Sequence, residues 1–380
     1  MLLEALPAAL DGSGPALLPL DPALPGALLA EMLRAWAPAE IQTRDGIERI
    51  SGRRPGTPAA AAVADEIAVV IATSGSTGQP KAAELPGPAL LASAGASLRR
   101  IGAAPGERWL CCLPVFHIAG IQVLVRSVLA GAEPVVAERV TPRVLESAGG
   151  CHVSLVPVQL RRLLDAGADL TGLRTILLGG SAIPDGLLGQ ASAAGARVVT
   201  TYGMTETCGG CVYDGVALDG VEVTIGADSR IRIAGPVLFS GYRLRPDLTA
   251  RVRDGRWFVT SDLGSLSPRG VLSVRGRADD VITTGGKKVV AAEVETVLAR
   301  CPGVGEAAVV GMPDPEWGER VTAVVVPADP ARPPTLAALR AAVSGDLPGY
   351  AAPRGLVIVP EIPMLASGKP DRRAIRQQGA

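Results

Sequence analysis

The sequence predicts an α/β fold in two parts: a large N-terminal domain with mostly parallel sheets covered by helices plus a β-rich section, and a small α+β C-terminal domain. The chain has 380 residues, which exceeds the roughly 150 residues of an average domain. Strand-like and helix-like stretches alternate between residues 67 and 201, as in parallel sheets. A shorter mixture of both follows residue 276. We therefore expect domains at 1–276 and 277–380.

The first predicted strand is Ile67–Ala72, a short uncharged run rich in β-branched residues that ends at a glycine cluster. A glycine-rich loop follows it, and we expect a helical stretch directly after that loop. Four further runs are expected strands of the parallel sheet: Trp109–Cys112, His152–Leu155, Leu173–Leu178 and Arg197–Thr201. Helices are expected at Val158–Leu164 and Pro184–Ala194, where Pro184 suits a first helical turn.

The pattern changes between Gly220 and Val274 to short alternating segments broken by Gly and Asp, which is typical of antiparallel β-structure. A charged turn at Gly276–Asp280 then marks the expected domain boundary. The final section contains, in order, an expected helix at Ala291–Ala299, strands at Ala307–Val310 and Val321–Val326, a helix at Leu336–Val343 and a strand at Leu356–Val359.

The composition argues for a small-molecule partner. Apolar residues make up 48% of the chain, and 37 basic residues balance 37 acidic ones, so neither disorder nor a nucleic-acid-binding surface is expected. The longest uncharged apolar run, Trp109–Val125, is shorter than the ~20 residues of a membrane helix and contains Pro114 and His117. We expect no membrane span.

The location is expected to be cytoplasmic. No basic residue precedes Arg34, which does not support a secretory or transit signal. Six cysteines without regular spacing do not form a disulfide framework and are typical of a reducing compartment. The sequence leaves the oligomeric state open, a homo-oligomer included.

A hydroxyl-rich glycine loop, Thr73–Lys81, reads Thr-Ser-Gly-Ser-Thr-Gly-Gln-Pro-Lys. Backbone N–H groups of such loops bind phosphate, glycines allow close approach, and Lys81 adds positive charge. The loop is not a Walker A motif, because no Gly-Lys-Ser/Thr ends it. The alternative interpretation is a plain Ser/Gly surface linker.

Four motifs together resemble those of the adenylate-forming (AMP-binding) superfamily of acyl-CoA synthetases, peptide-synthetase adenylation domains and luciferases. They occur in the family's order from about residue 65 to the end of the chain. The motifs are the phosphate loop at Thr73–Lys81, the aromatic-Gly-x-Thr-Glu motif at Thr201–Glu206, the hinge region at Gly276–Asp280 with Gly285–Gly286 and Glu293–Glu295, and Ser367–Lys369 near the C-terminus.

The resemblance implies a reaction in two steps. A substrate carboxylate attacks the α-phosphate of ATP to give an acyl-adenylate and pyrophosphate, and the thiol of coenzyme A then attacks the activated carbonyl. ATP, Mg²⁺ and coenzyme A are therefore the expected cofactors and co-substrates. The resemblance also implies that the C-terminal domain is a mobile lid that swings about Asp279.

Site residues carried over from the resemblance fall on matching positions of this chain. Glu206 would bind Mg²⁺, Thr205 would reach the α-phosphate, and Lys369 would bridge the attacking carboxylate and the α-phosphate. Contacts to the triphosphate and nucleoside would come from the phosphate-loop residues Thr73, Ser74, Gly75, Ser76, Thr77, Gly78 and Lys81, from Gly180, Ser181 and Tyr202 around adenine, and from Asp262 and Arg277 at the ribose.

Two features depart from the family pattern. Thr260-Ser261-Asp262 stands where the family usually has Thr-Gly-Asp, which keeps the ribose carboxylate but replaces a glycine. The phosphate loop begins about seventy residues into the chain, whereas family members usually carry a longer N-terminal region. We therefore expect part of the usual N-terminal subdomain to be trimmed.

The acid substrate is indicated by two stretches, Leu113–Gly120 and Tyr202–Cys208. They resemble most the o-succinylbenzoate:CoA ligases of menaquinone biosynthesis, whose substrate has an aliphatic carboxylate to activate and a second carboxylate on an aromatic ring. From this resemblance we expect an acyl pocket that is mostly apolar. Its candidate residues are Phe116, His117, Gly203, Met204 and Cys208.

Other functions stay open at this point. They are another aryl- or medium-chain acyl-CoA ligase, an adenylation module that loads a carrier protein, and a non-catalytic nucleotide-binding relative. Cys208-Gly209-Gly210-Cys211 has the spacing of a zinc or redox pair, but no second pair completes a ligand set, so no zinc site is expected. His152 is expected to be structural.

Overall fold

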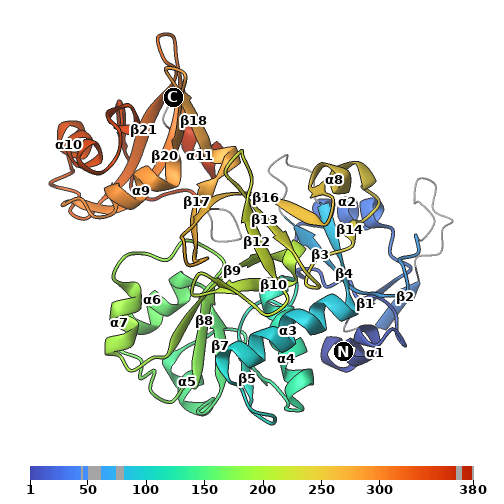
Figure 1. Ribbon diagram of the computed structural model, residues 1–380. Coiled ribbons are helices and arrows are strands. Elements are labelled where there is room, and N and C mark those ends of the chain that lie inside the picture. The colour runs from blue at the N-terminus through green and yellow to red at the C-terminus, as the bar shows by residue number, and fades with distance from the viewer. Residues whose placement is uncertain (44–45, 50–60, 74–80, 365–369, 379–380) are drawn as a thin grey trace. The chain divides into compact units, whose positions relative to one another are not determined.

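The structure is a computed structural model that describes residues 1–43, 46–49, 61–73, 81–364 and 370–378 (Figure 1). Internal contacts divide the chain into two compact units, and each is described by itself. The first unit contains Met1–Val223 and Ile233–Phe258, and the second contains Thr224–Arg232 and Val259–Ala380. The domain boundary expected between residues 276 and 277 stays a prediction.

A seven-stranded sheet forms the centre of the first unit. Its strands are β5 (Trp109–Cys111), β6 (Val135–Val136), β7 (His152–Leu155), β8 (Thr175–Gly179), β9 (Val198–Met204), β10 (Gly209–Tyr213) and β11 (Val216–Ala217). The strand order is β11-β10-β9-β8-β7-β5-β6. Neighbours among β5 to β9 pair in parallel, and β10 and β11 extend the sheet in antiparallel fashion. The predicted, mostly parallel sheet is confirmed.

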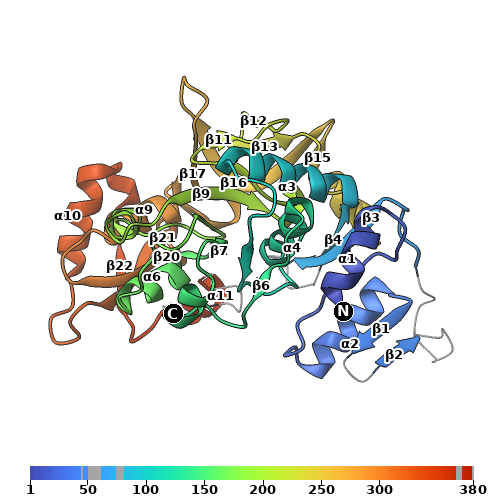
Figure 2. The same cartoon turned by 90° about the horizontal axis from the view of Figure 1, so that it is seen from below.

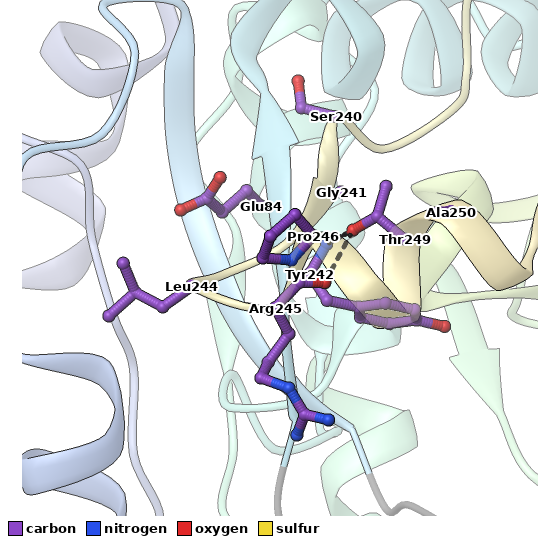
Figure 3. A pocket seen from close by; sticks show the side chains of 9 residues that line it. All are labelled: Glu84, Ser240, Gly241, Tyr242, Leu244, Arg245, Pro246, Thr249 and Ala250. Atoms are coloured by element: carbon purple, nitrogen blue, oxygen red, sulfur yellow. Dashed lines mark hydrogen bonds between the residues drawn. The ribbon is translucent and has the colours of Figure 1, made fainter.

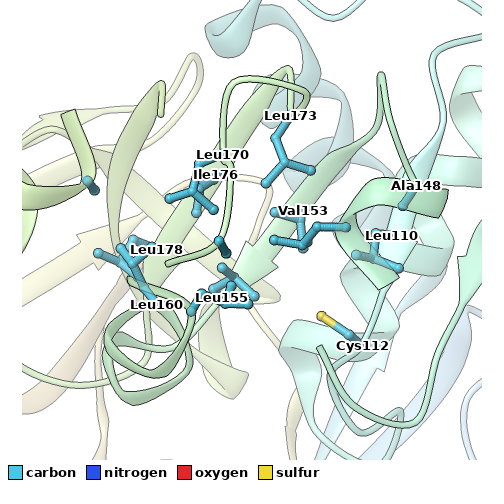
Figure 4. Packing of buried hydrophobic residues seen from close by; sticks show 14 of the residues in the cluster. Leu110, Cys112, Ala148, Val153, Leu155, Leu160, Leu170, Leu173, Ile176 and Leu178 are labelled. Carbon is cyan, nitrogen blue, oxygen red and sulfur yellow. The ribbon is translucent and has the colours of Figure 1, made fainter. Parts of the chain in front are cut away.

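Helices cover both faces of this sheet (Figures 1 and 2). On one face lie α5 (Pro142–Ser147), α6 (Pro157–Asp165) and α7 (Leu187–Ala193). On the other lie α3 (Gly87–Ile101) and α4 (Ile118–Ala130). Figure 4 shows part of the apolar core under α5–α7. The sheet residues of that core alternate along their strands: Leu110, Val153, Leu155, Ile176 and Leu178. Because successive strand residues face opposite ways, Trp109 and Ser154 instead contact Arg126 of α4.

The segment after the phosphate loop is a strand, so the expected helix there is wrong. β3 (Ile67–Thr73) and β4 (Lys81–Pro86) form an antiparallel pair, and β14 (Gly241–Tyr242) adds to β4. α3 begins only at Gly87. Ala82, Ala83 and Leu85 are fully buried, and pairing with β3 overrides the helical propensity of this Ala-rich segment.

Two further elements differ from the sequence prediction. The helix expected to start at Pro184 begins at Leu187, and Pro184 lies in the preceding turn, where its carbonyl accepts a hydrogen bond from the Leu187 N–H. The helix α4 was not predicted. It occupies the second half of the apolar run at residues 109–125 and is buried along most of its length, so it lacks the polar face that reveals a helix in a sequence. Within the described ranges, no helix is long and apolar enough to cross a membrane.

The N-terminal part of the first unit packs beside β3. Its elements are α1 (Leu2–Leu10), α2 (Gly26–Trp36), and the antiparallel pair β1 (Glu40–Thr43) and β2 (Gly46–Arg49). Met32 and Trp36 of α2 share a small core with Ile67, Val70 and Ala82. A short helix, α8 (Pro246–Arg251), follows β14.

The β-rich section expected at residues 220–274 is confirmed as a five-stranded sheet whose residues belong to both units. Its strands are β12 (Glu222–Ile225), β13 (Arg230–Ala234), β15 (Arg253–Asp254), β16 (Trp257–Leu266) and β17 (Leu272–Arg277). The strand order is β12-β13-β16-β15, and β17 also pairs with β16. The β15–β16 and β16–β17 pairs are antiparallel.

The rest of the second unit is a small α+β structure, as predicted. Its elements are β18 (Val281–Thr284), β19 (Lys287–Val290), α9 (Ala291–Leu298), β20 (Val304–Asp314), β21 (Gly318–Pro327), α10 (Leu336–Asp346), β22 (Gly355–Ile358) and α11 (Arg372–Gln378). The sheet order is β19-β18-β21-β20, with β22 parallel to β21. Residues of α9 and α10 pack on one face, and Ile375 of α11 packs on the other.

Candidate active site

Three side chains from distant parts of the chain meet in the first unit. The Lys81 Nζ donates a hydrogen bond to the Tyr242 Oη at 2.9 Å, and that hydroxyl donates to the Glu206 Oε1 at 2.6 Å. The Lys81 Nζ also lies 3.7 Å from the Glu206 Oε1 and 4.2 Å from the centre of the Tyr242 ring. Glu206 is 8% exposed. Lys81 and Glu206 were predicted together, whereas Tyr242 was not.

The local folds explain how the three groups meet. Lys81 is the first residue of β4, and Tyr242 pairs with Ala83 on the same strand through β14. Glu206 lies in a 3₁₀ turn, Thr205–Thr207, that directly follows β9. Its carbonyl accepts a hydrogen bond from the Phe239 N–H at 3.0 Å, which ties this turn to the segment before β14.

Tyr242 is fixed by its surroundings on both sides. Its backbone N–H donates to the Thr249 Oγ1 of α8 at 2.8 Å (Figure 3). Thr249 also packs so closely on Gly241 that a Cβ there would lie 2.9 Å from the Thr249 Oγ1, so only glycine fits. The ring meets the Phe239 ring edge-on at 5.0 Å. Burial, and next the Glu206 carboxylate, raise the pKa of Tyr242, so the hydroxyl keeps its proton and donates it.

A pocket of about 470 Å³ lies next to Tyr242, and Figure 3 shows the side chains that line it. Its wall is formed by β4, β14 and α8. The lining residues are Glu84, Ser240, Gly241, Tyr242, Leu244, Arg245, Pro246, Thr249 and Ala250.

The phosphate loop is described only at its ends. Thr73 pairs with Lys81 across the β3–β4 ladder, and its Oγ1 donates to the Lys81 carbonyl at 3.3 Å. The predicted phosphate ligands between these two ends, Ser74, Gly75, Ser76, Thr77 and Gly78, lie outside the described residues.

A second cavity of about 110 Å³ lies between α4 and the sheet, beside the motif on β9. Gly203 and Met204, both predicted for the acyl pocket, line it together with Gly180. A side chain at Gly203 is excluded, because its Cβ would lie 2.0 Å from the Gly209 carbonyl oxygen. The other lining residues are Leu113, Ile118, Ala119, Gln122, Arg126, Ser154, Leu155, Val156, Leu177, Gly179, Thr201, Gly209, Gly210 and Tyr213.

The polar part of this cavity comes from Gln122 and Arg126, one turn apart on α4. The Arg126 Nη2 donates to the Ser154 Oγ at 2.9 Å, and the guanidinium lies 4.2 Å from the centre of the Trp109 ring. The Gln122 Nε2 donates to the Cys208 carbonyl at 2.7 Å. Among the described residues, the Arg126 Nε and Gln122 Oε1 have no hydrogen-bond partner.

Arg126 is a buried cation, 4% exposed. Burial lowers the pKa of Arg126, although a guanidinium stays protonated at neutral pH. In the part of the chain that the structure describes, no carboxylate forms an ion pair with Arg126. A buried charge without a counter-charge is costly, and an anion bound in this cavity would offset that cost.

The remaining acyl-pocket candidates do not line this cavity. His117 immediately precedes α4 and is exposed, and its ring meets Phe116 edge-on at 4.8 Å. Cys208 is fully buried, and burial raises the pKa of its thiol. The structure therefore brings Gly203 and Met204 into the cavity and leaves the other three outside its wall.

Residues predicted around the nucleoside are divided between the units. Tyr202 is half-buried on β9 opposite Val212, Ser181 is exposed after β8, and Thr205 is half-buried. In the second unit, Asp262 and Arg277 face each other across β16 and β17, with the Arg277 Nη1 3.4 Å from the Asp262 Oδ1.

The hinge candidate lies beside that ion pair. The Arg277 Nη2 is 3.1 Å from the Asp279 Oδ2, so one arginine contacts both carboxylates. Ser261, which stands in place of the usual glycine, lies within β16, and the Thr260 Oγ1 beside it accepts a hydrogen bond from the Asp262 N–H at 3.0 Å. Lys369 lies outside the described residues.

The chemistry of the first cluster fits Mg²⁺ bound with a nucleotide. Within the described ranges, no three His, Cys, Asp or Glu side chains come together as a metal site. Mg²⁺ usually needs only one or two carboxylates, with substrate phosphates and water completing its shell. The carboxylate oxygens of Glu206 can serve as such a Mg²⁺ ligand, and the adjacent Lys81 can neutralise phosphate charge.

Two models of known protein domains match the chain. The AMP-binding enzyme family matches residues 13–254, and the AMP-binding enzyme C-terminal domain matches residues 293–369. The chain belongs to the AMP-binding enzyme family.

Within this family, the similar proteins include several 2-succinylbenzoate–CoA ligases. A relative from Mycobacterium tuberculosis, named probable 2-succinylbenzoate–CoA ligase, is 46% identical over 327 residues, covering 82% of this chain and 84% of that protein. The o-succinylbenzoate CoA synthetase of Bacillus subtilis in complex with the acyl-adenylate intermediate OSB-AMP has a TM-score of 0.75 at 30% identity, covering 83% of this chain and 70% of that one. The same enzyme with ATP and magnesium ion has a TM-score of 0.73 at 30% identity, covering 81% and 69%.

Two residues of the site were missed by the sequence analysis. Arg126 is the first charged residue after the apolar run, and with Gln122 it forms a polar pair spaced i, i+4 on one face of a helix. That spacing is a usable signal once the run is taken as a helix. Tyr242 carries no such signal, because only the tertiary pairing of β14 with β4 brings it to Glu206.

Proposed function

We propose that this protein is an ATP-dependent acid:CoA ligase that converts o-succinylbenzoate into o-succinylbenzoyl-CoA. The family and the relatives support the reaction type. The observation that carries the choice of acid is Arg126, a buried cation without a carboxylate partner among the described residues, in a largely apolar cavity beside the Thr201–Glu206 motif.

The reaction proceeds through two displacements. In the first, a carboxylate oxygen of the acid attacks the α-phosphorus of ATP, the bond to the bridging oxygen breaks, and pyrophosphate leaves. In the second, the sulfur of coenzyme A attacks the acyl carbon, the thiol proton is released, and AMP leaves with the oxygen that joined it to the acyl group. Negative charge on phosphate is present throughout, so cations are the principal catalytic need.

The chain's own residues supply that need in assigned roles. Lys81 neutralises phosphate charge, and Glu206 holds Mg²⁺, which when bound compensates the charge of the triphosphate. Thr205 reaches the α-phosphate, and Asp262 with Arg277 binds the ribose. Lys369 reaches the attacking carboxylate during the first displacement only.

Arg126 gives the site a reason to prefer an acid with two carboxylates. One carboxylate of o-succinylbenzoate reacts at the α-phosphate. It therefore lies outside the polar part of the cavity, which Gln122 and Arg126 form. The ring carboxylate is left over, and it can pair with Arg126 while the ring occupies the apolar wall. A monocarboxylic acid such as benzoate or octanoate would leave the guanidinium unpaired, which costs binding energy.

The test is turnover with ATP and coenzyme A, measured for o-succinylbenzoate beside benzoate, octanoate and acetate. We expect kcat/KM for o-succinylbenzoate to exceed the others by on the order of 10²-fold or more. Equal or better use of benzoate or octanoate would leave an acyl-CoA ligase of different specificity. Pyrophosphate release without thioester formation would instead indicate an adenylation module, and no pyrophosphate release with any acid would indicate a non-catalytic protein.

We assign the reaction to the cytoplasm. All six cysteines are free thiols, which is typical of proteins in a reducing compartment. Fractionation of cells that express the protein, with enzyme activity as the readout, tests this assignment.

A further inference from the structure

The Tyr242 hydroxyl lies between the two charged groups of the nucleotide site and bonds to both. It accepts from the Lys81 Nζ at 2.9 Å and donates to the Glu206 Oε1 at 2.6 Å. The two charges themselves are 3.7 Å apart, which is longer than the roughly 2.7–2.9 Å of a direct charge-assisted hydrogen bond. The hydroxyl therefore hydrogen-bonds to each charged group, while the two groups remain an ion pair without a direct short hydrogen bond.

We propose that Tyr242 is a positioning residue that keeps Lys81 and Glu206 apart and available before Mg²⁺·ATP binds. This inference rests on the proposed function, because it takes Lys81 as a phosphate ligand and Glu206 as a Mg²⁺ ligand. Tyr242 itself contacts neither phosphate nor metal in this role. It acts by holding the two side chains that do.

The physical reason is the competition between an internal ion pair and the ligand. Side chains in this site are largely shielded from water, so Lys81 and Glu206 attract each other more strongly than at a surface. Without the hydroxyl, Lys81 would close onto Glu206. Mg²⁺·ATP would then have to break that direct pair before it could bind to either residue.

The surroundings of Tyr242 suit a fixed spacer. Thr249 accepts from the Tyr242 backbone N–H, the Phe239 ring packs on its ring, and Gly241 allows α8 to approach. The ring cannot swing away without losing these contacts.

The test is Tyr242→Phe, which removes only the hydroxyl and keeps the ring. Isothermal titration calorimetry compares binding of Mg²⁺·ATP with binding of AMP. We expect Mg²⁺·ATP to bind about tenfold or more weakly, the loss typical of one hydrogen bond to a charged group. AMP, which has neither the β- nor the γ-phosphate, should bind within about twofold of the parent.

The control is Tyr350→Phe, which removes an exposed tyrosine hydroxyl in the second unit and should change neither affinity. Equal weakening of AMP and Mg²⁺·ATP by Tyr242→Phe would mean a general structural role and overturn the proposal. Unchanged or tighter Mg²⁺·ATP binding would overturn it as well, since the hydroxyl would then be dispensable or would restrain Lys81.

A second background makes the test specific to the ion pair. In Lys81→Met no cation remains to close onto Glu206, so adding Tyr242→Phe should weaken Mg²⁺·ATP binding by less than about twofold further. An undiminished effect in this background would show that the hydroxyl does not act through Lys81. Failure of the parent protein itself to bind Mg²⁺·ATP would instead refute the proposed function, so the two failures are distinguishable.

Discussion

At the scale of single residues, we expect Arg126 to decide which acid the site prefers. Replacing it by methionine keeps an unbranched side chain of similar length but removes the charge. We expect Arg126→Met to lower kcat/KM for o-succinylbenzoate by about 10²-fold, the effect of leaving a charged group without its partner. Because the cation is unpaired among the described residues in the absence of substrate, the midpoint of thermal unfolding should stay level or rise.

The comparison for this variant is Arg139→Met, which changes an exposed arginine in the same unit and should leave both measurements unaltered. Use of o-succinylbenzoate by Arg126→Met at the parent's efficiency would remove Arg126 from substrate recognition. A large loss of thermal stability would show instead that Arg126 holds the fold through Ser154 and Trp109.

Single residues also show which parts of the site can be predicted from the sequence. Lys81 and Glu206 were found because each lies in a motif of adjacent residues, and the structure places their charged atoms 3.7 Å apart. Tyr242 and Arg126 were not found, because their importance comes from neighbours far away in the chain. His117 was chosen for its motif, yet it does not line the described cavity.

At the scale of elements, β7 begins with a buried histidine that links stability to pH. The His152 Nε2 is 2.9 Å from the Glu107 Oε2, and among the described residues its Nδ1 has no partner. Burial lowers the pKa of His152, and the hydrogen bond from His152 lowers the pKa of Glu107. Folding therefore favours neutral histidine and ionised glutamate. Both contributions are present at neutral pH.

We expect the urea midpoint of unfolding to fall as the pH is lowered. The loss from His152 begins below its unfolded pKa of about 6.5, and that from Glu107 follows below about 4.3. His152→Gln should be less stable at pH 7 and should lose less stability between pH 7 and pH 5. A variant whose midpoint falls as steeply as the parent's over this range would show that other groups control the acid response.

Elements differ in how well the sequence reveals them. β7, β8, α6 and α9 were predicted because their periodicity and flanking residues agree with their surroundings. β4 was mistaken for a helix, because Ala82 and Ala83 favour helices unless a neighbouring strand pairs with them, as β3 does. α4 was missed because burial on most sides removed the alternation of polar and apolar residues.

At the scale of the whole molecule, we expect the two half-reactions to need different arrangements of the same groups. We expect the C-terminal domain predicted at 277–380 to change its arrangement through backbone rotation at Asp279. Asp279→Pro fixes φ near −65° and should slow one half-reaction at least tenfold more than the other. Adenylation is followed by pyrophosphate release, and thioester formation is assayed separately from supplied acyl-adenylate.

Asp279→Ala is the matched variant, because it removes the contact with Arg277 while leaving φ free. It should affect both half-reactions far less than the proline variant does. If proline and alanine have the same effect, the side chain matters and the backbone hinge does not. Equal loss of both half-reactions in a folded Asp279→Pro protein would also contradict a hinge at this residue.

The distribution of the free thiols gives each unit its own chemical label. Cys111, Cys112, Cys151, Cys208 and Cys211 are buried in the first unit, whereas Cys301, in the second, is partly accessible. A thiolate attacks an alkylating reagent only where the reagent can reach it, so we expect Cys301 to be modified from the intact state. The other five become reactive only when their unit opens. Mass spectrometry can follow the alkylation of each cysteine-containing peptide over time. The rates for the five buried cysteines therefore measure how often the first unit opens while the protein is otherwise native.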